Sequence, residues 1–193
     1  MLLLTRGRVE RVTALEVQEH YAALTRRNAE LNRLSDRLTA VATDLRDYKS
    51  ERDFDIVYTN PPYMKTGGGK ENGLQKKNIA RHEVMGGIED FCKGAQRLLK
   101  YGGAFYAVYR PDRLADLISA MREASIEPKR LTMVHADTLS EPSMVLVEGK
   151  SSARSGMLVT KPLIIYKDQT HGGYSADMDY IMQNGCFPEE FRR

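Results

Sequence analysis

The stretch Phe54-Asp55-Ile56-Val57-Tyr58-Thr59-Asn60-Pro61-Pro62-Tyr63 predicts a strand that ends in a stiff turn. Its first half is rich in aromatic and β-branched residues, which suit a buried parallel strand. The two prolines fix φ at about −65°, remove two amide donors and force the residue before each of them into extended backbone. Open α/β sheets bind ligands at the carboxyl ends of their strands, so this turn is the first candidate site.

The turn offers two hydrogen-bond acceptors, the side-chain oxygen of Asn60 and the carbonyl oxygen of Pro61. A planar amino group, such as the exocyclic amine of adenine or a side-chain amide, is a poor nucleophile because its lone pair is delocalised. Two acceptors that take both of its protons would orient it for attack, and the ring of Tyr63 could stack on it. We therefore predict catalytic roles for Asn60, Pro61, Pro62 and Tyr63. The same four residues can also form an ordinary turn or a proline-rich ligand.

Length and composition are those of one globular domain. The chain has 193 residues, 41% hydrophobic and 28% charged, which is enough for a substantial core. A formal net charge of +3 permits nucleic-acid binding without arguing for it. Residues 1–4 are too short an apolar run for a signal peptide or a membrane span, and we expect no membrane association. Cys92 and Cys186 lack metal-ligand spacing, which favours a reducing cytoplasm and no metal site.

Strands and helices alternate along most of the chain. Residues 2–5 are expected to end a helix, and a longer helix is expected over 18–34, with Tyr21, Leu24 and Leu31 on its buried face. Further helices are expected to begin at 82 and 110, the first of them with Cys92 in its apolar stripe. Strands are predicted over 9–17, 38–42, 54–60, 104–109, 130–136, 143–148 and 158–166. This order predicts an α/β doubly wound sheet that ends in an antiparallel strand pair.

A glycine-rich, basic loop over residues 64–78 follows the turn directly. Its lysines are candidates to contact the phosphates of an RNA backbone, although a solvated surface loop is the alternative. Gly67-Gly68-Gly69 lacks the Gly-Lys-Ser/Thr ending of a phosphate-binding P-loop. The predicted RNA-binding residues are Lys65, Lys70, Lys76, Lys77, Arg81, His82 and Arg110.

Asn60-Pro61-Pro62-Tyr63 after a strand resembles the turn of S-adenosylmethionine-dependent methyltransferases that act on planar nitrogens. Further stretches narrow the resemblance, at 60–67, 79–83, 109–114, 127–130, 145–149 and 162–166. Together they are similar to the bacterial adenine-N6 methyltransferases that modify valine tRNA beside the anticodon, over roughly residues 9–166. The resemblance implies S-adenosylmethionine as methyl donor, tRNA as partner, and a Rossmann-like class I methyltransferase sheet.

Two acids at strand ends are candidates to bind this cofactor, together with Asn60. Glu16 closes the strand over 9–17, where an acid commonly takes the ribose hydroxyls. Asp44 closes the next strand, and the resemblance implies that it reaches the adenine amine of the cofactor. The alternative is that both are ordinary loop carboxylates, with Asp44 capping a helical turn.

The resemblance also implies a segment that this chain does not supply. Such a sheet has a first strand and a glycine-rich turn before its first helix, and that turn approaches the methionine part of the cofactor. We therefore expect residues 1–166 to be a partial methyltransferase domain that lacks this strand and turn and binds S-adenosylmethionine weakly or not at all by itself. Residues 167–193 are polar, and we expect a loosely attached tail.

Three functions follow. The leading one is methyl transfer to the exocyclic N6 amine of an adenosine in tRNA. The second keeps the chemistry but changes the acceptor to a glutamine of a peptide-release factor or an adenine in DNA. The third is a non-catalytic RNA-binding protein. The basic loop and the stretches downstream of Tyr63 favour RNA.

Overall fold

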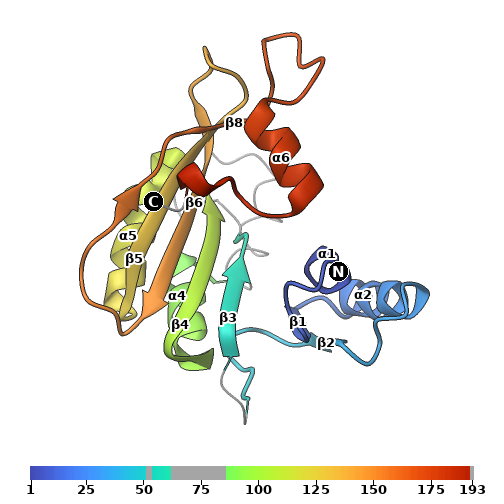
Figure 1. The fold of residues 1–193 in the computed structure, drawn as a ribbon. Coiled ribbons are helices and arrows are strands. Elements are labelled where there is room, and N and C mark those ends of the chain that lie inside the picture. Colours follow the sequence, from blue (N-terminus) through green and yellow to red (C-terminus); the bar gives the residue numbers. More distant parts are fainter. Residues whose placement is uncertain (51–53, 62–85, 192–193) are drawn as a thin grey trace, which may run out of the picture. The chain divides into compact units, whose positions relative to one another are not determined.

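The structure is a computed structural model that describes residues 1–50, 54–61 and 86–191. The chain divides into two compact units, Met1–Ser50 and Glu51–Arg193, called unit 1 and unit 2 below. Figure 1 shows the elements of each unit in chain order. The single sheet expected from the sequence is divided among the described residues into a two-stranded sheet in unit 1 and a six-stranded sheet in unit 2.

Unit 1 is a strand–helix–strand unit preceded by a short helix. Its elements are α1 (Leu2–Thr5), β1 (Val12–Glu16), α2 (Glu19–Leu31) and β2 (Leu38–Ala42). The two strands pair in parallel, with Glu16 opposite Ala42, because a crossover helix connects them. A small core holds the unit together, formed by Leu4, Ala29, Leu34, Leu38 and Ala40.

The predicted buried face of α2 is wrong. Tyr21, Leu24 and Leu31 are 50%, 40% and 72% exposed, whereas Ala22 and Ala29 are buried. The prediction gave weight to large apolar side chains. Alanine instead faces the core of the unit because a small side chain lets a helix lie close to its neighbours. The helix also begins and ends inside the predicted range of 18–34.

Unit 2 is built on a sheet in the order β3-β4-β6-β5-β7, with β8 also paired to β5. The strands are β3 (Phe54–Thr59), β4 (Leu99–Tyr109), β5 (Ile126–His135), β6 (Pro142–Ser151), β7 (Leu158–Val159) and β8 (Leu163–Ile164). β6 is antiparallel to β4 and β5, and the other pairs are parallel. The predicted antiparallel strand pair is therefore confirmed as β5 and β6.

Several strand bounds differ from the prediction. β4 begins at Leu99 rather than at residue 104, and Gly102 takes a left-handed φ of 73° within it. β5 begins at Ile126 and contains Pro128, which the strand accommodates by a register shift before Arg130. The predicted edge strand over 158–166 is interrupted into β7 and β8 around Pro162, which cannot donate to a strand ladder.

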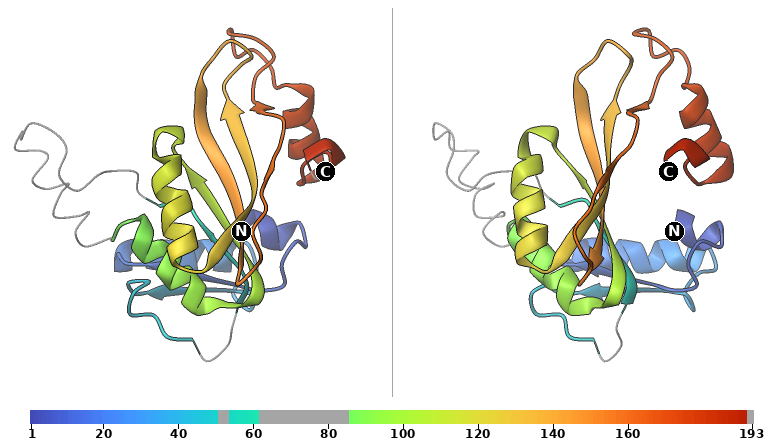
Figure 2. Two further views of the ribbon diagram at one scale, coloured as in Figure 1. Left: turned by 90° about the vertical axis from the view of Figure 1, so that its left-hand side faces the viewer. Right: turned by 60° about the vertical axis from the view of Figure 1, so that its left-hand side comes forward.

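Helices cover both faces of the unit 2 sheet. α4 (Ile88–Leu98) and α5 (Leu114–Glu123), which follows the short η1 (Pro111–Arg113), lie on one face, and α6 (Ala176–Asn184) lies on the other (Figure 2). The largest core lies between the sheet, α4 and α5, and it includes Phe105 and Cys92. Cys92 is fully buried there, which confirms the prediction that it is a core residue, and burial raises the pKa of its thiol to about 12.

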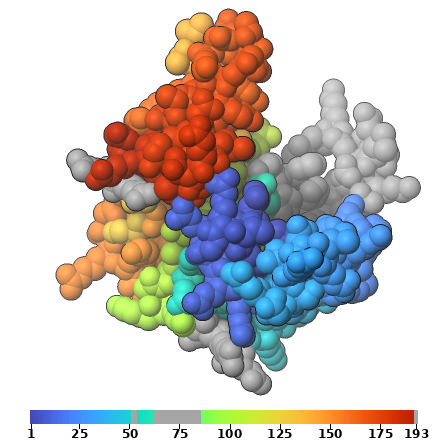
Figure 3. All heavy atoms as spheres, turned by 45° about the vertical axis from the view of Figure 1, so that its right-hand side comes forward, coloured from blue at the N-terminus to red at the C-terminus, as the bar shows by residue number. Residues whose placement is uncertain are grey.

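The segment after Tyr166 is packed more firmly than its polar composition suggested. Phe191, at the end of η2 (Glu189–Phe191), is 1% exposed and packs with Val134 and Leu163. The space-filling view shows the surface of this C-terminal segment in red (Figure 3). A few well-placed aromatic residues are enough to attach an otherwise polar segment. The domain boundary at Tyr166 stays a prediction.

Candidate functional site

In unit 2, the predicted amine-binding turn lies at the carboxyl edge of the sheet. β3 ends at Thr59, and Asn60 and Pro61 follow at once. Thr59 pairs with Ala107 of the parallel strand β4, so the two strands end side by side. Asn60 is exposed and Pro61 is buried. The structure therefore anchors the turn at Pro61 and presents Asn60 to solvent at the edge where such sheets bind ligands.

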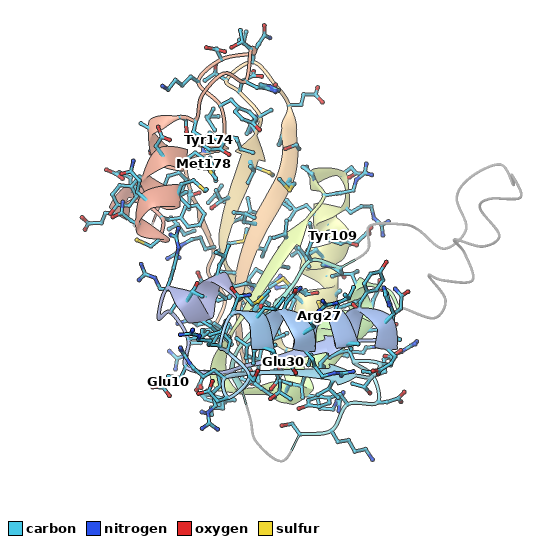
Figure 4. All side chains as sticks on the ribbon, turned by 90° about the vertical axis from the view of Figure 1, so that its right-hand side faces the viewer. Glu10, Arg27, Glu30, Tyr109, Tyr174 and Met178 are labelled. Carbon is cyan, nitrogen blue, oxygen red and sulfur yellow. The ribbon has the colours of Figure 1, made fainter. Side chains whose placement is uncertain are left out.

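The strand that carries this turn, β3, packs against the largest core of unit 2. Val57 packs against the largest core, and its register partner Phe105 is fully buried. Tyr109, at the end of the neighbouring strand, is 2% exposed, and burial raises the pKa of its phenol. Figure 4 labels Tyr109 at this edge. The partly buried Val57 on β3, the buried side chains of β4 and the buried Pro61 hold the turn in one position, which suits a site that must orient an amine.

Arg110 follows β4 and lies on the same edge as Asn60. Its Nε and one terminal nitrogen donate to the carboxylate of Asp112 at 2.8 and 3.1 Å. This pairing holds the pKa of the Asp112 carboxyl below its usual value. The Arg110 side chain is 54% exposed, and a guanidinium has five donors. Arg110 is therefore oriented by Asp112 while most of its surface faces solvent.

In unit 1, the two predicted cofactor acids share the carboxyl edge of β1 and β2. Glu16 lies opposite Ala42, and Asp44 follows two residues later. Glu16 Oε1 accepts a hydrogen bond of 2.9 Å from the backbone N–H of Gln18, which fixes the carboxylate at the strand end. The structure thus brings Glu16 and Asp44 to one edge, as the sequence predicted.

Asp44 is held by an arginine that the sequence reasoning missed. Arg46 donates to its carboxylate from Nε at 2.9 Å, from a terminal nitrogen at 2.5 Å and from the backbone N–H at 2.8 Å. These hydrogen bonds lower the pKa of the Asp44 carboxyl. An arginine two residues after an acid at a strand end could have indicated this ion pair from the sequence. Asp44 therefore shares its carboxylate oxygens with Arg46. The cofactor-binding roles of Glu16 and Asp44 stay predictions.

Two predicted catalytic residues and most of the predicted RNA-binding residues lie outside the described residues. The catalytic ones are Pro62 and Tyr63, and the RNA-binding ones are Lys65, Lys70, Lys76, Lys77, Arg81 and His82. Their roles stay predictions. The described part of the site consists of two separate pairs, Glu16 with Asp44 in unit 1 and Asn60 with Arg110 in unit 2.

The described residues contain no group of three or more His, Cys, Asp or Glu side chains placed to hold a metal ion. None of their helices has both the length and the apolar character needed to cross a membrane.

The family is decided by a match that covers most of the chain. The model of the methyltransferase small domain matches residues 1–125, which include all of unit 1 and the strand and turn that carry Asn60. The chain belongs to the methyltransferase small domain family. Glu16, Asp44 and the Asn60–Pro61 turn all lie within the residues that match this family.

Curated relatives of the chain confirm the resemblance to the adenine-N6 methyltransferases. It is 29% identical over 142 residues to the tRNA1(Val) (adenine(37)-N6)-methyltransferase of Phocaeicola vulgatus, covering 74% of this chain and 60% of that protein. It is 32% identical over 107 residues to the protein of the same name from Bacteroides thetaiotaomicron, covering 55% and 44%. The chain thus spans less than two thirds of the length of these two relatives.

Solved structures confirm the fold class. A predicted O-methyltransferase from Agrobacterium tumefaciens superposes with a TM-score of 0.73 at 20% identity, covering 96% of this chain and 84% of that one. An S-adenosylmethionine-dependent O-methyltransferase from Thermotoga maritima gives 0.52 at 15% identity, covering 76% and 51%. Likeness at such identities concerns the fold alone, which is that of the class I S-adenosylmethionine-dependent methyltransferases.

Proposed function

We propose that this chain acts in the S-adenosylmethionine-dependent methylation of the exocyclic N6 amine of an adenosine in tRNA. One observation carries the proposal: the Asn60–Pro61 turn stands at the carboxyl edge of the unit 2 sheet, beside the end of β4. The names of the curated relatives support adenosine 37, next to the anticodon, as the acceptor. The cytoplasmic location expected from the cysteines stays a prediction.

The turn would orient the acceptor through its two oxygens. The side-chain oxygen of Asn60 and the carbonyl oxygen of Pro61 accept the two N–H groups of the amine, which directs its lone pair away from the turn. S-adenosylmethionine, when bound, supplies a methyl group on a positively charged sulfur. The oriented nitrogen forms a bond to the methyl carbon while the carbon–sulfur bond breaks and sulfur keeps its electron pair. The extra proton then leaves the nitrogen for solvent, so no general base is needed before transfer.

The remaining described residues would hold the two ligands. Glu16 would accept the ribose hydroxyls of the donor, because its carboxylate is fixed at the end of β1. Arg110 would contact a phosphate of the RNA near the target nucleotide, because its oriented guanidinium is half exposed on the same edge as Asn60. Tyr63 is predicted to stack on the target base.

The proposal is tested by deleting the gene in the organism that carries it. Deleting the gene should remove N6-methyladenosine from the tRNA pool, measured by mass spectrometry of nucleosides, and an intact copy should restore it. An unchanged level of N6-methyladenosine in tRNA would contradict the proposal.

A second assay identifies the acceptor. The purified protein is offered tRNA, DNA and a peptide-release factor side by side with labelled donor. Label in tRNA alone is the expected result. Label in the release factor or the DNA would establish the alternative acceptor. Salt-dependent tRNA binding without transfer to any acceptor would favour a non-catalytic RNA-binding protein.

A further inference from the structure

Three aromatic rings stack in the C-terminal segment of unit 2, apart from the residues discussed above. The ring of Tyr166 stacks on His171, with centroids 4.3 Å apart and planes at 19°, and on Tyr174, with 5.8 Å and 17°. We call these three residues the aromatic stack. The His171 side chain is 49% exposed and Tyr174 is 39% exposed. The stack therefore offers ring surface to solvent instead of hiding it in a core.

Local hydrogen bonds give the loop that carries the stack a defined shape. The N–H of Lys167 donates to the carbonyl of Gly173 at 3.0 Å, and Tyr166 and Tyr174 form an antiparallel bridge. His171 takes a left-handed φ of 54°, which costs energy for a residue other than glycine. In this backbone conformation the imidazole of His171 lies on the Tyr166 ring.

The stack is fixed to the same edge of the sheet as Asn60. The N–H of Tyr166 donates to the carbonyl of Ala136, just beyond β5, at 2.8 Å. The strands β3, β4, β5 and β8 are all parallel, so their carboxyl ends share one edge. Four strand spacings separate β3 from β8, about 19 Å. This distance corresponds to several nucleotide steps, so one bound RNA strand could contact both places through different nucleotides.

Beside the stack lie a buried carboxylate, which local hydrogen bonds satisfy, and an exposed ammonium group. Asp137 accepts hydrogen bonds from the N–H groups of Leu139 and Ser140 and from Ser140 Oγ, at 2.7 to 3.0 Å. Its Oδ2 lies 3.8 Å from His171 Nε2, which places the carboxylate at the edge of the imidazole ring. Lys167 is exposed and its side chain runs over Gly173. A flat ring and an ammonium group lie close together on this surface.

We propose that the aromatic stack is a second RNA contact: an unpaired nucleobase stacks on His171 while Lys167 contacts a neighbouring phosphate. This rests on the proposed function, which makes RNA the substrate. Exposed aromatic rings beside a cation are how proteins hold single-stranded nucleotides, since every base has a flat face. The loop between the rings is polar, with Asp168, Gln169 and Thr170 exposed, so an apolar protein surface is a poor partner for it. The Asp168 carboxylate accepts hydrogen bonds from the N–H and the hydroxyl of Thr170.

The test is the affinity of the 193-residue chain for a dye-labelled anticodon stem-loop, measured by fluorescence anisotropy. His171→Asn removes the ring but keeps a residue that tolerates the left-handed region. It should weaken binding about tenfold with an unchanged salt slope, because a stacked base and not a charge is lost. His171→Phe should recover most of the affinity. Tyr180→Ala, which removes an exposed ring on α6 outside the stack, is the matched control and should bind like wild type.

A separate variant tests the phosphate contact. Lys167→Ala should reduce the slope of log affinity against log salt by about 0.7 to 0.9. Thermal melting of each variant checks that the loop change leaves the fold intact.

Equal stem-loop affinity of His171→Asn and wild type would overturn this inference, as would a wild-type chain that does not bind the stem-loop. The proposed function is judged separately by the N6-methyladenosine content of tRNA in the deletion strain. Loss of that nucleoside combined with an unaffected His171→Asn variant would leave the proposed function standing and remove the second contact.

Discussion

The carboxyl edges of unit 1 and unit 2 both present oxygen acceptors, but they hold them differently. In unit 1, Glu16 and Asp44 are fixed by hydrogen bonds from residues two positions away, over a core made largely of alanine and leucine. In unit 2, Asn60 follows a strand packed on a large core that contains the fully buried Phe105.

The difference suits the two tasks proposed for these edges, binding the donor and orienting the amine. Ribose hydroxyls are held well by a charged acceptor, and a local hydrogen bond is enough to aim it. A weakly nucleophilic amine needs two neutral oxygens held at a set distance, because a small displacement costs much of the rate. We infer that packing positions the reacting group and that local hydrogen bonds position the carboxylates that recognise the donor. Substitutions at the two edges should separate the two ways of positioning, and they are given from the largest expected effect to the smallest.

Phe105→Ala should destabilise unit 2 by about 3 to 5 kcal/mol, because it leaves a cavity under the strand pair that carries Asn60. Urea unfolding followed by circular dichroism measures the change. Tyr101→Ala, at a position 86% exposed, is the control and should change stability by less than about 0.5 kcal/mol. A loss below about 1 kcal/mol for Phe105→Ala would show that packing does not hold this edge.

Asn60→Ala should reduce the rate of methyl transfer to tRNA by about 10² to 10³, the cost of losing one preorganised hydrogen-bond partner of a reacting group. Initial rates with protein from its native cell measure the effect. Asn60→Asp keeps an acceptor oxygen and should be less impaired. A rate within about threefold of wild type for Asn60→Ala would remove Asn60 from the mechanism.

Glu16→Gln should weaken binding of the demethylated donor about tenfold, because a charged acceptor becomes a neutral one. Calorimetry on protein from its native cell measures the affinity. Glu10→Gln, an exposed acid of the same unit, should bind like wild type. Equal affinities of Glu16→Gln and Glu10→Gln would make Glu16 an ordinary loop carboxylate.

Arg46→Ala should have the smallest effect, about 0.5 kcal/mol of stability at neutral pH. Arg46 lowers the pKa of Asp44 in the folded state, so its stabilisation is present above the ordinary value near 3.9 and is lost as the pH falls through the lowered pKa. Unfolding at pH 7 and at about pH 2 should therefore show a difference between variant and wild type only at the higher pH. A difference that persists in acid would assign the effect to packing of the arginine stem.

Local patterns were enough to predict the edge of unit 2. The strand predicted over 54–60 is found as β3 (Phe54–Thr59), because β-branched and aromatic residues favour extended backbone directly. The prediction that this strand is buried is wrong, since Ile56 and Tyr58 are 42% and 55% exposed. The bounds of β2 match the prediction for the same reason. The antiparallel pair β5 and β6 followed from two apolar runs with a short polar connection.

Long-range geometry accounts for what the sequence did not reveal. The buried face of α2 depends on which side chains are small enough for close packing, so Ala22 and Ala29 lie inside while Leu31 is exposed. The stack of Tyr166, His171 and Tyr174 depends on a loop that returns along itself, and these spacings follow no helical or strand period. Hydrophobic periodicity carries no information about either feature.

The most direct test of the central claim is a double-mutant cycle between Asn60 and the target amine. Wild type and Asn60→Ala are each bound to two anticodon stem-loops, one with the target adenosine and one with purine riboside, which lacks the N6 amine. Fluorescence anisotropy gives the four affinities. The account predicts that removing the amine weakens binding by wild type about fivefold to tenfold and weakens binding by Asn60→Ala clearly less, because only the Pro61 carbonyl still accepts an N–H group of the amine there. An equal loss in both proteins would contradict it, because the amine would then be recognised somewhere other than at the Asn60 turn.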